Sequence, residues 1–171
     1  YVRRRNPRVK VAPVIYGGGH ELGLRSGTLN VPGIVGMGKA FEIAGQQMKA
    51  DAKKYREWTK MMYEQLCEQL GDVALNGHPT QRLPHNLNVS IKGIESKSLV
   101  VQLKNIAIST GSACTSATVE PSHVIKALGF GEDRAHSAIR MGVGRSNYQA
   151  QLHEAIIVIA QAARRIQQLI S

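Results

Sequence analysis

Apolar residues recur about every 3.6 positions between residues 32 and 71, and this period predicts one long amphipathic helix. The predicted stripe consists of Met37, Phe41, Ala44, Met48, Ala52, Tyr55, Met62, Leu66 and Leu70. Pro32 suits the first turn of such a helix, and Gly71 ends the pattern. Glycines are frequent in the first half of the stretch and weaken a helix, so a bend or a division into two helices stays open there.

Shorter apolar segments follow Gly71. Three-residue runs and alternating residues predict strands at 73–75, 87–91, 106–108 and 138–143. Short helices are expected at 96–104, with Leu99, Val100 and Leu103 inward, and from Pro121-Ser122 to Gly129. A last helix is expected to bury a stripe formed by Tyr148, Leu152, Ile156, Ile159, Ala163, Ile166 and Ile170. This alternation indicates an α/β domain of about a hundred residues behind a long linking helix.

The composition of the chain excludes some classes of protein. The 171 residues are 43% hydrophobic, enough for one ordinary core, and no apolar run approaches the ~20 residues that span a bilayer. The net charge of +10 comes partly from a basic cluster at residues 3–10. Aromatic residues are scarce and no nucleic-acid-binding motif follows, so solvated faces and an acidic protein partner are favoured over RNA or DNA.

Two cysteines, without a CxxC pair, argue against a disulfide scaffold or a zinc ribbon and indicate a reducing, cytoplasmic setting. Cys67 lies in a helical pattern beside Leu66 and Leu70, where a small packed hydrophobe is expected. Cys114 lies among small residues just after an apolar run, in STGSACTSA at 109–117. Exposure and room are what a nucleophilic thiolate needs, so Cys114 is the candidate nucleophile. His123 and His136 are the histidines near it in sequence, and no spacing supports either as its base.

Two further motifs carry donors for anions. The loop GGGHELGLRSGT at 17–28 combines glycines with Arg25, Ser26 and Thr28, which favours phosphate over the alternative of a plain flexible turn. It lacks the lysine of a Walker A motif and the third glycine of a Rossmann fingerprint. Arg140 lies on the strand face opposite Ile139 and Met141, where it can bind a carboxylate or form an ordinary surface ion pair.

The three motifs together resemble the IscS/NifS-type cysteine desulfurases of the class V aminotransferases. They are GGGHE with RSGT at 17–28, GSACTS at 111–116 with EPSH at 120–123, and IRMGVGR at 139–145, in the order and spacing of that family. The GSACTS form is similar to the group with the longer cysteine loop. The resemblance implies a fold-type-I homodimer that uses pyridoxal 5'-phosphate, with residues 1–31 ending the large cofactor domain, 32–71 as the linking helix and 72–171 as the small α/β domain.

The resemblance also assigns roles. Cys114 would take the sulfur of cofactor-bound L-cysteine as a persulfide, leaving L-alanine, and would pass it to an iron–sulfur scaffold or a tRNA-thiolation partner. Cys114 would also serve as a transient iron–sulfur ligand shared with the scaffold. Thr28 would contribute to the cofactor phosphate site of the neighbouring subunit, and Arg140 would hold the substrate carboxylate.

Two departures from the family stand out. Leu22 follows GGGHE where the family usually has arginine, and no lysine of the chain lies in the Ser-x-His-Lys setting of the Schiff-base lysine. The chain is therefore expected to be the C-terminal half of a desulfurase, inactive alone and without covalently bound cofactor. The alternatives are a cofactor-independent persulfide carrier or scaffold-binding module, a selenocysteine lyase-like enzyme, and a basic nucleic-acid-binding domain.

Overall fold

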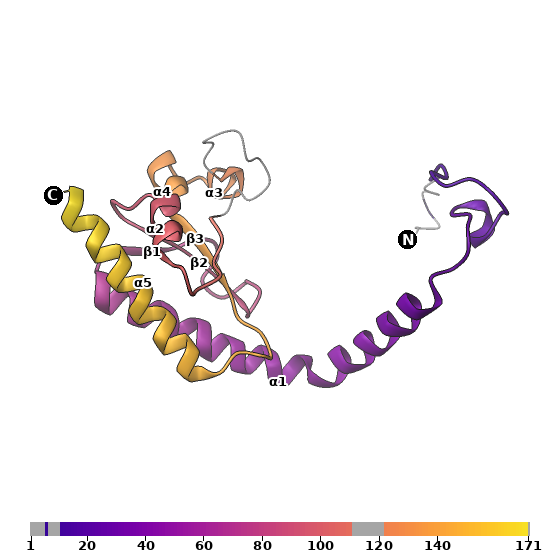
Figure 1. The fold of residues 1–171 in the computed structure, drawn as a ribbon, viewed down its shortest axis with the longest axis horizontal. Coiled ribbons are helices and arrows are strands. Elements are labelled where there is room, and N and C mark those ends of the chain that lie inside the picture. The colour runs from indigo at the N-terminus through magenta and orange to yellow at the C-terminus, as the bar shows by residue number, and fades with distance from the viewer. Residues whose placement is uncertain (1–5, 7–10, 111–121, 171) are drawn as a thin grey trace. The chain divides into compact units, whose positions relative to one another are not determined.

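A three-stranded antiparallel sheet organises the fold (Figure 1). The computed structural model describes residues 6, 11–110 and 122–170. Its elements in chain order are η1 (Glu21–Gly23), α1 (Val31–Leu70), β1 (Val73–Leu75), β2 (Asn86–Ile91), α2 (Ser96–Gln102), α3 (His123–Ala127), α4 (Glu132–His136), β3 (Ala138–Gly142) and α5 (Gln149–Ile170). The chain divides into two units, Tyr1–Gln46 and Gln47–Ser171, and each is described by itself.

The sheet of the second unit has the order β1-β2-β3, and both pairs of strands are antiparallel. Val89 lies opposite Leu75 in β1 and opposite Ile139 in β3, which fixes the register across the sheet. Because side chains alternate along a strand, this register directs the large apolar residues of all three strands to one face. The polar residues of β2 and β3 therefore share the other face.

The apolar face of the sheet is covered by the second half of α1 and by α5, which run beside each other in Figure 1. Leu66, Ile156 and Ile159 are fully buried between helices and sheet. Polar contacts also join the helices: Arg164 donates to the Gln69 carbonyl at 2.8 Å, and the His153 ring lies 3.2 Å from Gln65 Oε1. One continuous core thus fixes the orientation of the sheet, and with it the direction of the opposite, polar face.

The short helices α3 and α4 lie on that opposite face of the sheet. Ile125, Ala135 and Ala138 form a small buried cluster there, and Phe130 packs against it. Gly129 ends the α3 turn with φ +82°, a left-handed conformation that glycine adopts without steric cost. These helices cover the Ser90–Ala138 end of the polar face and leave Arg140 exposed.

Most of the expected elements are confirmed, and α1 is one helix despite its glycines. Its two halves differ in burial: Tyr55, Met62 and Leu66 are buried, whereas Phe41 is 71% exposed and Met48 62%. Periodicity predicts the apolar face of a helix, but it does not say whether another element covers that face.

Four details of the predicted elements were wrong. Residues 106–108 form no strand, and only an isolated bridge joins Ser109 to Arg140. Tyr148 precedes α5 and is 70% exposed, so it is not part of the buried stripe. Val100 is only half-buried beside the buried Leu99 and Leu103. The pattern also missed α4, because five residues are too few to show a helical period.

Candidate functional site

Three polar residues form a row across the open face of the sheet. Arg140 in β3 lies directly opposite Asn88 in β2, and on its other side it pairs with Ser109. Side chains of directly opposed antiparallel residues project from the same face of the sheet. The sheet therefore brings Asn88, Arg140 and Ser109 together on one surface.

The backbone of Arg140 is held firmly by Ser109. The Arg140 N–H donates to the Ser109 carbonyl at 2.7 Å, and the Ser109 N–H donates to the Arg140 carbonyl at 3.0 Å. These bonds direct the polar backbone groups of Arg140 away from β2, so Asn88 and Arg140 form the closer, non-hydrogen-bonded type of pair, with Cα atoms about 4.5 Å apart. Arg140 is thus anchored next to the start of the segment that carries Cys114.

The guanidinium of Arg140, in contrast, has no hydrogen-bond or ion-pair partner among residues 6, 11–110 and 122–170, and the residue is exposed. Arg145 differs, because its Nε donates to Asp51 Oδ2 at 2.7 Å, and this bond raises the pKa of Arg145. Of these two neighbouring arginines, Arg140 is the one with a planar donor fork available to a carboxylate ligand.

A polar network adjoins this row through Asn88. Arg134 Nε donates to Asn76 Oδ1 at 2.7 Å, and Asn76 Nδ2 donates to Asn88 Oδ1 at 2.7 Å and to Ser90 Oγ at 2.9 Å. Ser90 Oγ in turn donates to the Arg134 carbonyl at 2.7 Å. Asn76 and Ser90 are buried, so these hydrogen bonds satisfy polar groups that water does not reach.

Two arginines enclose the network. The Arg134 guanidinium lies 3.5 Å above the Phe130 ring centroid and also donates to the Leu75 carbonyl at 2.6 Å. Arg82 Nη1 donates to the Asn76 carbonyl at 3.2 Å, and burial lowers the pKa of Arg82. The sequence prediction missed this network, although alternation along 86–91 already placed Asn88 on the face opposite Leu87 and Val89.

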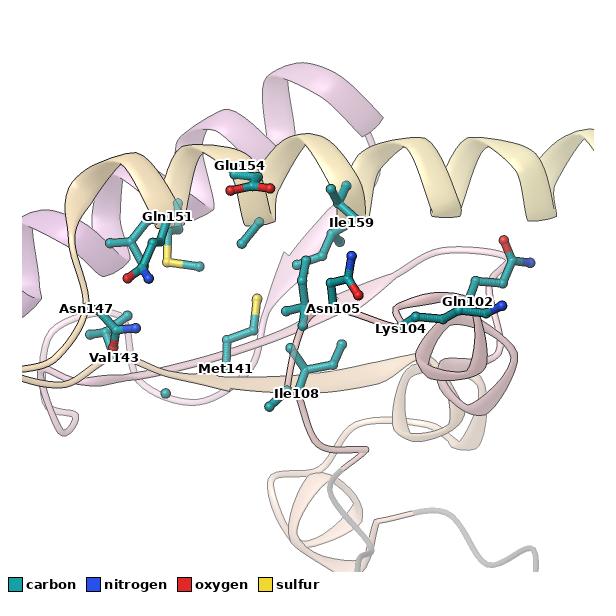
Figure 2. A pocket seen from close by; sticks show the side chains of 17 residues that line it. Gln102, Lys104, Asn105, Ile108, Met141, Val143, Asn147, Gln151, Glu154 and Ile159 are labelled. Atoms are coloured by element: carbon teal, nitrogen blue, oxygen red, sulfur yellow. The ribbon is translucent and has the colours of Figure 1, made fainter.

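A cavity of about 560 Å³ opens between α5 and the segment 102–108 (Figure 2). Met141, Val143 and Ile159 contribute apolar lining, while Lys104, Asn147 and Glu154 contribute polar groups. Met141 projects from the face of β3 opposite Arg140. The cavity is therefore separate from the polar row.

The glycine-rich loop lies in the first unit and ends in exposed donors. Ser26 is buried, and its Oγ accepts from the Gly19 N–H at 3.2 Å, which closes the loop. Arg25 Nη1 donates to the Gly27 carbonyl at 2.9 Å and to the Thr28 carbonyl at 3.0 Å. Thr28 itself is exposed. Leu22 is 95% exposed at φ +57°, and nothing in the structure explains why it replaces the usual arginine.

Of the two cysteines, Cys67 lies among the described residues and Cys114 does not. Cys67 is half-buried and packs against the core, as expected, with Sγ 3.8 Å from the Val73 carbonyl. Burial and its neighbour Cys67 raise the pKa of the Tyr63 hydroxyl.

Cys114 lies in 111–121, outside the described residues, so its environment stays a prediction. Among the residues that are described, His123 is exposed at the start of α3, and no group of three or more metal-ligating side chains occurs.

Residues 3–154 match the family described as aminotransferase class-V. The chain belongs to this family. It is 45% identical over 166 residues to the cysteine desulfurase IscS of Acinetobacter baumannii (strain AYE), an alignment that covers 97% of this chain and 41% of the relative. It is 44% identical over 169 residues to the cysteine desulfurase IscS of Anaeromyxobacter dehalogenans (strain 2CP-C), covering 99% and 42%.

The fold agrees with the sequence comparison. The crystal structure of a NifS-like protein from Rickettsia africae ESF-5 superimposes with a TM-score of 0.77 at 25% identity, covering 91% of this chain and 41% of that one. The expected resemblance and the mixed α/β fold are therefore confirmed. The chain spans about two fifths of the length of the IscS relatives that it matches. In the part of the chain that is described, no helix is long and apolar enough to cross a membrane.

Proposed function

We propose that this class V aminotransferase chain carries the sulfur-accepting half of a cysteine desulfurase. In the proposed reaction the C–S bond of L-cysteine breaks and an S–S bond to Cys114 forms. L-Cysteine and the Cys114 thiol together give L-alanine and a Cys114 persulfide, so that atoms and protons balance. The carbon that loses sulfur is reduced by two electrons, and the two sulfur atoms of the new persulfide, one from L-cysteine and one from Cys114, lose those two electrons together.

The observation that supports this proposal most strongly is the combination of a bonded backbone and an exposed guanidinium at Arg140. Its guanidinium is exposed without a partner among the described residues, while two backbone hydrogen bonds tie Arg140 to Ser109. In the proposed site this guanidinium binds the carboxylate of L-cysteine by two parallel hydrogen bonds. A fixed backbone suits that role, since only the side chain of Arg140 has to be ordered when the ligand binds.

The short stretch of chain between Ser109 and Cys114 supports contact between Cys114 and a ligand bound to Arg140. Cys114 lies five positions after Ser109, and an extended chain covers at most about 18 Å over five residue steps. Ser109 itself is the backbone partner of Arg140. The chain is therefore long enough for the Cys114 sulfur to reach a substrate held by Arg140.

The donors at the end of the glycine-rich loop fit one edge of pyridoxal 5'-phosphate. Thr28 and Arg25 are both exposed, and the Arg25 guanidinium contacts the Thr28 carbonyl, which suits a phosphate group of the cofactor bound in a neighbouring subunit. When bound, the cofactor supplies the electron sink that activates L-cysteine. No lysine here has the Ser-x-His-Lys setting, so we assign the Schiff-base lysine to residues outside these 171.

The same proposal includes three parts of the chain: residues 1–31 end the cofactor domain, 32–71 form the linking helix and 72–171 form the small domain. It also includes a homodimeric, cytoplasmic enzyme that delivers sulfur to an iron–sulfur scaffold or to a tRNA-thiolation protein. Cys114 then also serves as a transient ligand to a cluster shared with the scaffold. The 171-residue chain alone neither binds the cofactor covalently nor turns over cysteine. A cofactor absorbance band together with sulfide release from the isolated chain would contradict this assignment.

The test uses the native polypeptide that carries this chain, supplied with pyridoxal phosphate and L-cysteine. Formation of L-alanine is expected, with loss of sulfide release in Cys114→Ser and retention in Cys67→Ser, the matched control. Unchanged sulfide release in Cys114→Ser would refute the role of Cys114. If the native polypeptide gives no L-alanine but Cys114 accepts sulfur from a separate desulfurase, the chain is a persulfide carrier instead.

A further inference from the structure

The amide orientations in the polar network can be assigned from the chemistry of its members. An arginine side chain only donates hydrogen bonds, so the Asn76 atom 2.7 Å from Arg134 Nε must be the oxygen. The Asn76 nitrogen then faces Asn88 at 2.7 Å, and the facing Asn88 atom must be an acceptor, its Oδ1. Arg134 thus fixes the orientation of two amides in succession.

This orientation leaves the Asn88 Nδ2 amino group turned away from Asn76. Among the described residues it has no hydrogen-bond partner, and Asn88 is half-buried on the face that carries Arg140. Arg140 is its direct cross-strand neighbour in the closer type of antiparallel pair. Two sets of unused donors, one charged and one neutral, therefore lie side by side, and no carboxylate of the described residues is bonded to either.

We propose that Asn88 is a second substrate-binding residue, which donates through Nδ2 to the carboxylate held by Arg140. The inference rests on the carboxylate role proposed for Arg140. Asn76 and Arg134 are positioning residues in this arrangement, since they act only through the orientation of the Asn88 amide. A neutral donor beside the guanidinium adds a hydrogen bond to the anion and restricts its position across the sheet.

The test is a titration of the ¹⁵N-labelled chain followed by NMR, with L-alanine as the probe because it has the substrate carboxylate but no sulfur. L-Alaninamide, which lacks the carboxylate, is the control ligand at equal ionic strength. The side-chain signals of Asn88 Nδ2H₂ and Arg140 Nε–H are expected to shift with one common saturation curve. Neither signal is expected to saturate with L-alaninamide.

Two variants sharpen the test. Asn88→Ala is expected to weaken L-alanine binding about threefold to tenfold, the effect of one hydrogen bond to an anion at a partly exposed site. Asn86→Ala is the matched control, because Asn86 lies on the same face of β2 opposite Gly142 and its side chain makes no described hydrogen bond. Binding by this control is expected to equal that of the parent chain.

The possible results of the titration distinguish an error about Asn88 from an error about the carboxylate role of Arg140, on which the inference rests. If Arg140 saturates while the Asn88 amide does not respond, or if Asn88→Ala binds as tightly as the parent, the inference about Asn88 is wrong and Arg140 keeps its role. If neither signal shifts, or if L-alaninamide shifts both signals as L-alanine does, the proposed binding of the carboxylate by Arg140 is wrong as well. The wild-type amide signals are read without any substitution, so a misfolded variant does not prevent a decision.

Discussion

At the scale of single residues, Arg140 combines a fixed backbone with a guanidinium that has no hydrogen-bond or ion-pair partner in the described part of the chain. Lysine in its place keeps the positive charge but loses the planar fork that binds a carboxylate through two parallel bonds. In the native enzyme, Arg140→Lys is therefore expected to raise KM for L-cysteine about tenfold, with a smaller effect on kcat. Steady-state formation of L-alanine at varied L-cysteine measures both constants.

Arg165→Lys is the matched control for this prediction, because Arg165 is exposed on α5 and its side chain makes no described contact. It is expected to leave KM unchanged. A normal KM in Arg140→Lys would show that the substrate carboxylate binds elsewhere.

Sequence alternation was enough to place Arg140 on the polar face, because Ile139 and Met141 define the buried side of a short strand. It was not enough to single out Asn88. An asparagine in a strand is an ordinary solvent-facing residue until the register is known, and the register places it opposite Arg140. The role of Asn76 depends on contacts with Arg134, which is 58 positions away, and no local pattern predicts that contact.

At the scale of elements, one ion pair joins the two short helices on the polar face. Lys126 Nζ in α3 lies 2.8 Å from Glu132 Oε1 in α4, and the Lys126 ammonium lowers the pKa of Glu132 below its ordinary value of 4.5. A carboxyl whose pKa falls on folding stabilises the fold above its unfolded pKa. This stabilisation is lost as the pH falls through the lower, folded pKa.

Glu132→Gln is accordingly expected to lower the Tm slightly at pH 7, and the difference in Tm between the two proteins is expected to shrink toward pH 3 as Glu132 takes up its proton. The effect is small because both partners are exposed to solvent. Thermal unfolding of both chains at the two pH values measures it. An equal difference in Tm at pH 7 and pH 3 would mean that the charge of Glu132 contributes nothing.

The two halves of α1 allow a second prediction at this scale. Leu66 is fully buried against the sheet and α5, so Leu66→Ala removes packed methyl groups and leaves a cavity. The free energy of unfolding is expected to fall by about 2–5 kcal/mol in urea denaturation of the chain. Phe41→Ala, at a position that is 71% exposed, is the control and is expected to change it by less than about 0.5 kcal/mol.

The existence of most elements followed from the sequence, since long periodic stretches such as α1 and α5 carry a strong signal. Residues 106–108 show where that signal failed. An apolar run of three residues fits a strand or an extended loop equally well, and only the Ser109–Arg140 bridge forms next to it. Whether a strand forms there depends on β3, which lies about thirty positions later in the chain.

At the scale of the whole molecule, stability is concentrated in the second unit. Along the described part of the chain, the first buried hydrophobic side chain is Tyr55. A chain that begins at Gln47 is therefore expected to keep its cooperative unfolding, with a urea midpoint close to that of the 171-residue chain. Denaturation followed by circular dichroism measures this. A large loss of stability on removal of residues 1–46 would show that the first unit supports the core.

The central claim is that Cys114 accepts sulfur from L-cysteine held at Arg140. The most direct measurement is peptide mass spectrometry of the native enzyme after a brief incubation with L-cysteine and alkylation. The account predicts one additional sulfur atom on the peptide that contains Cys114, none on the peptide that contains Cys67, and much less labelling in Arg140→Lys. L-Alanine formation without added sulfur on Cys114, or with sulfur on Cys67 instead, would contradict it.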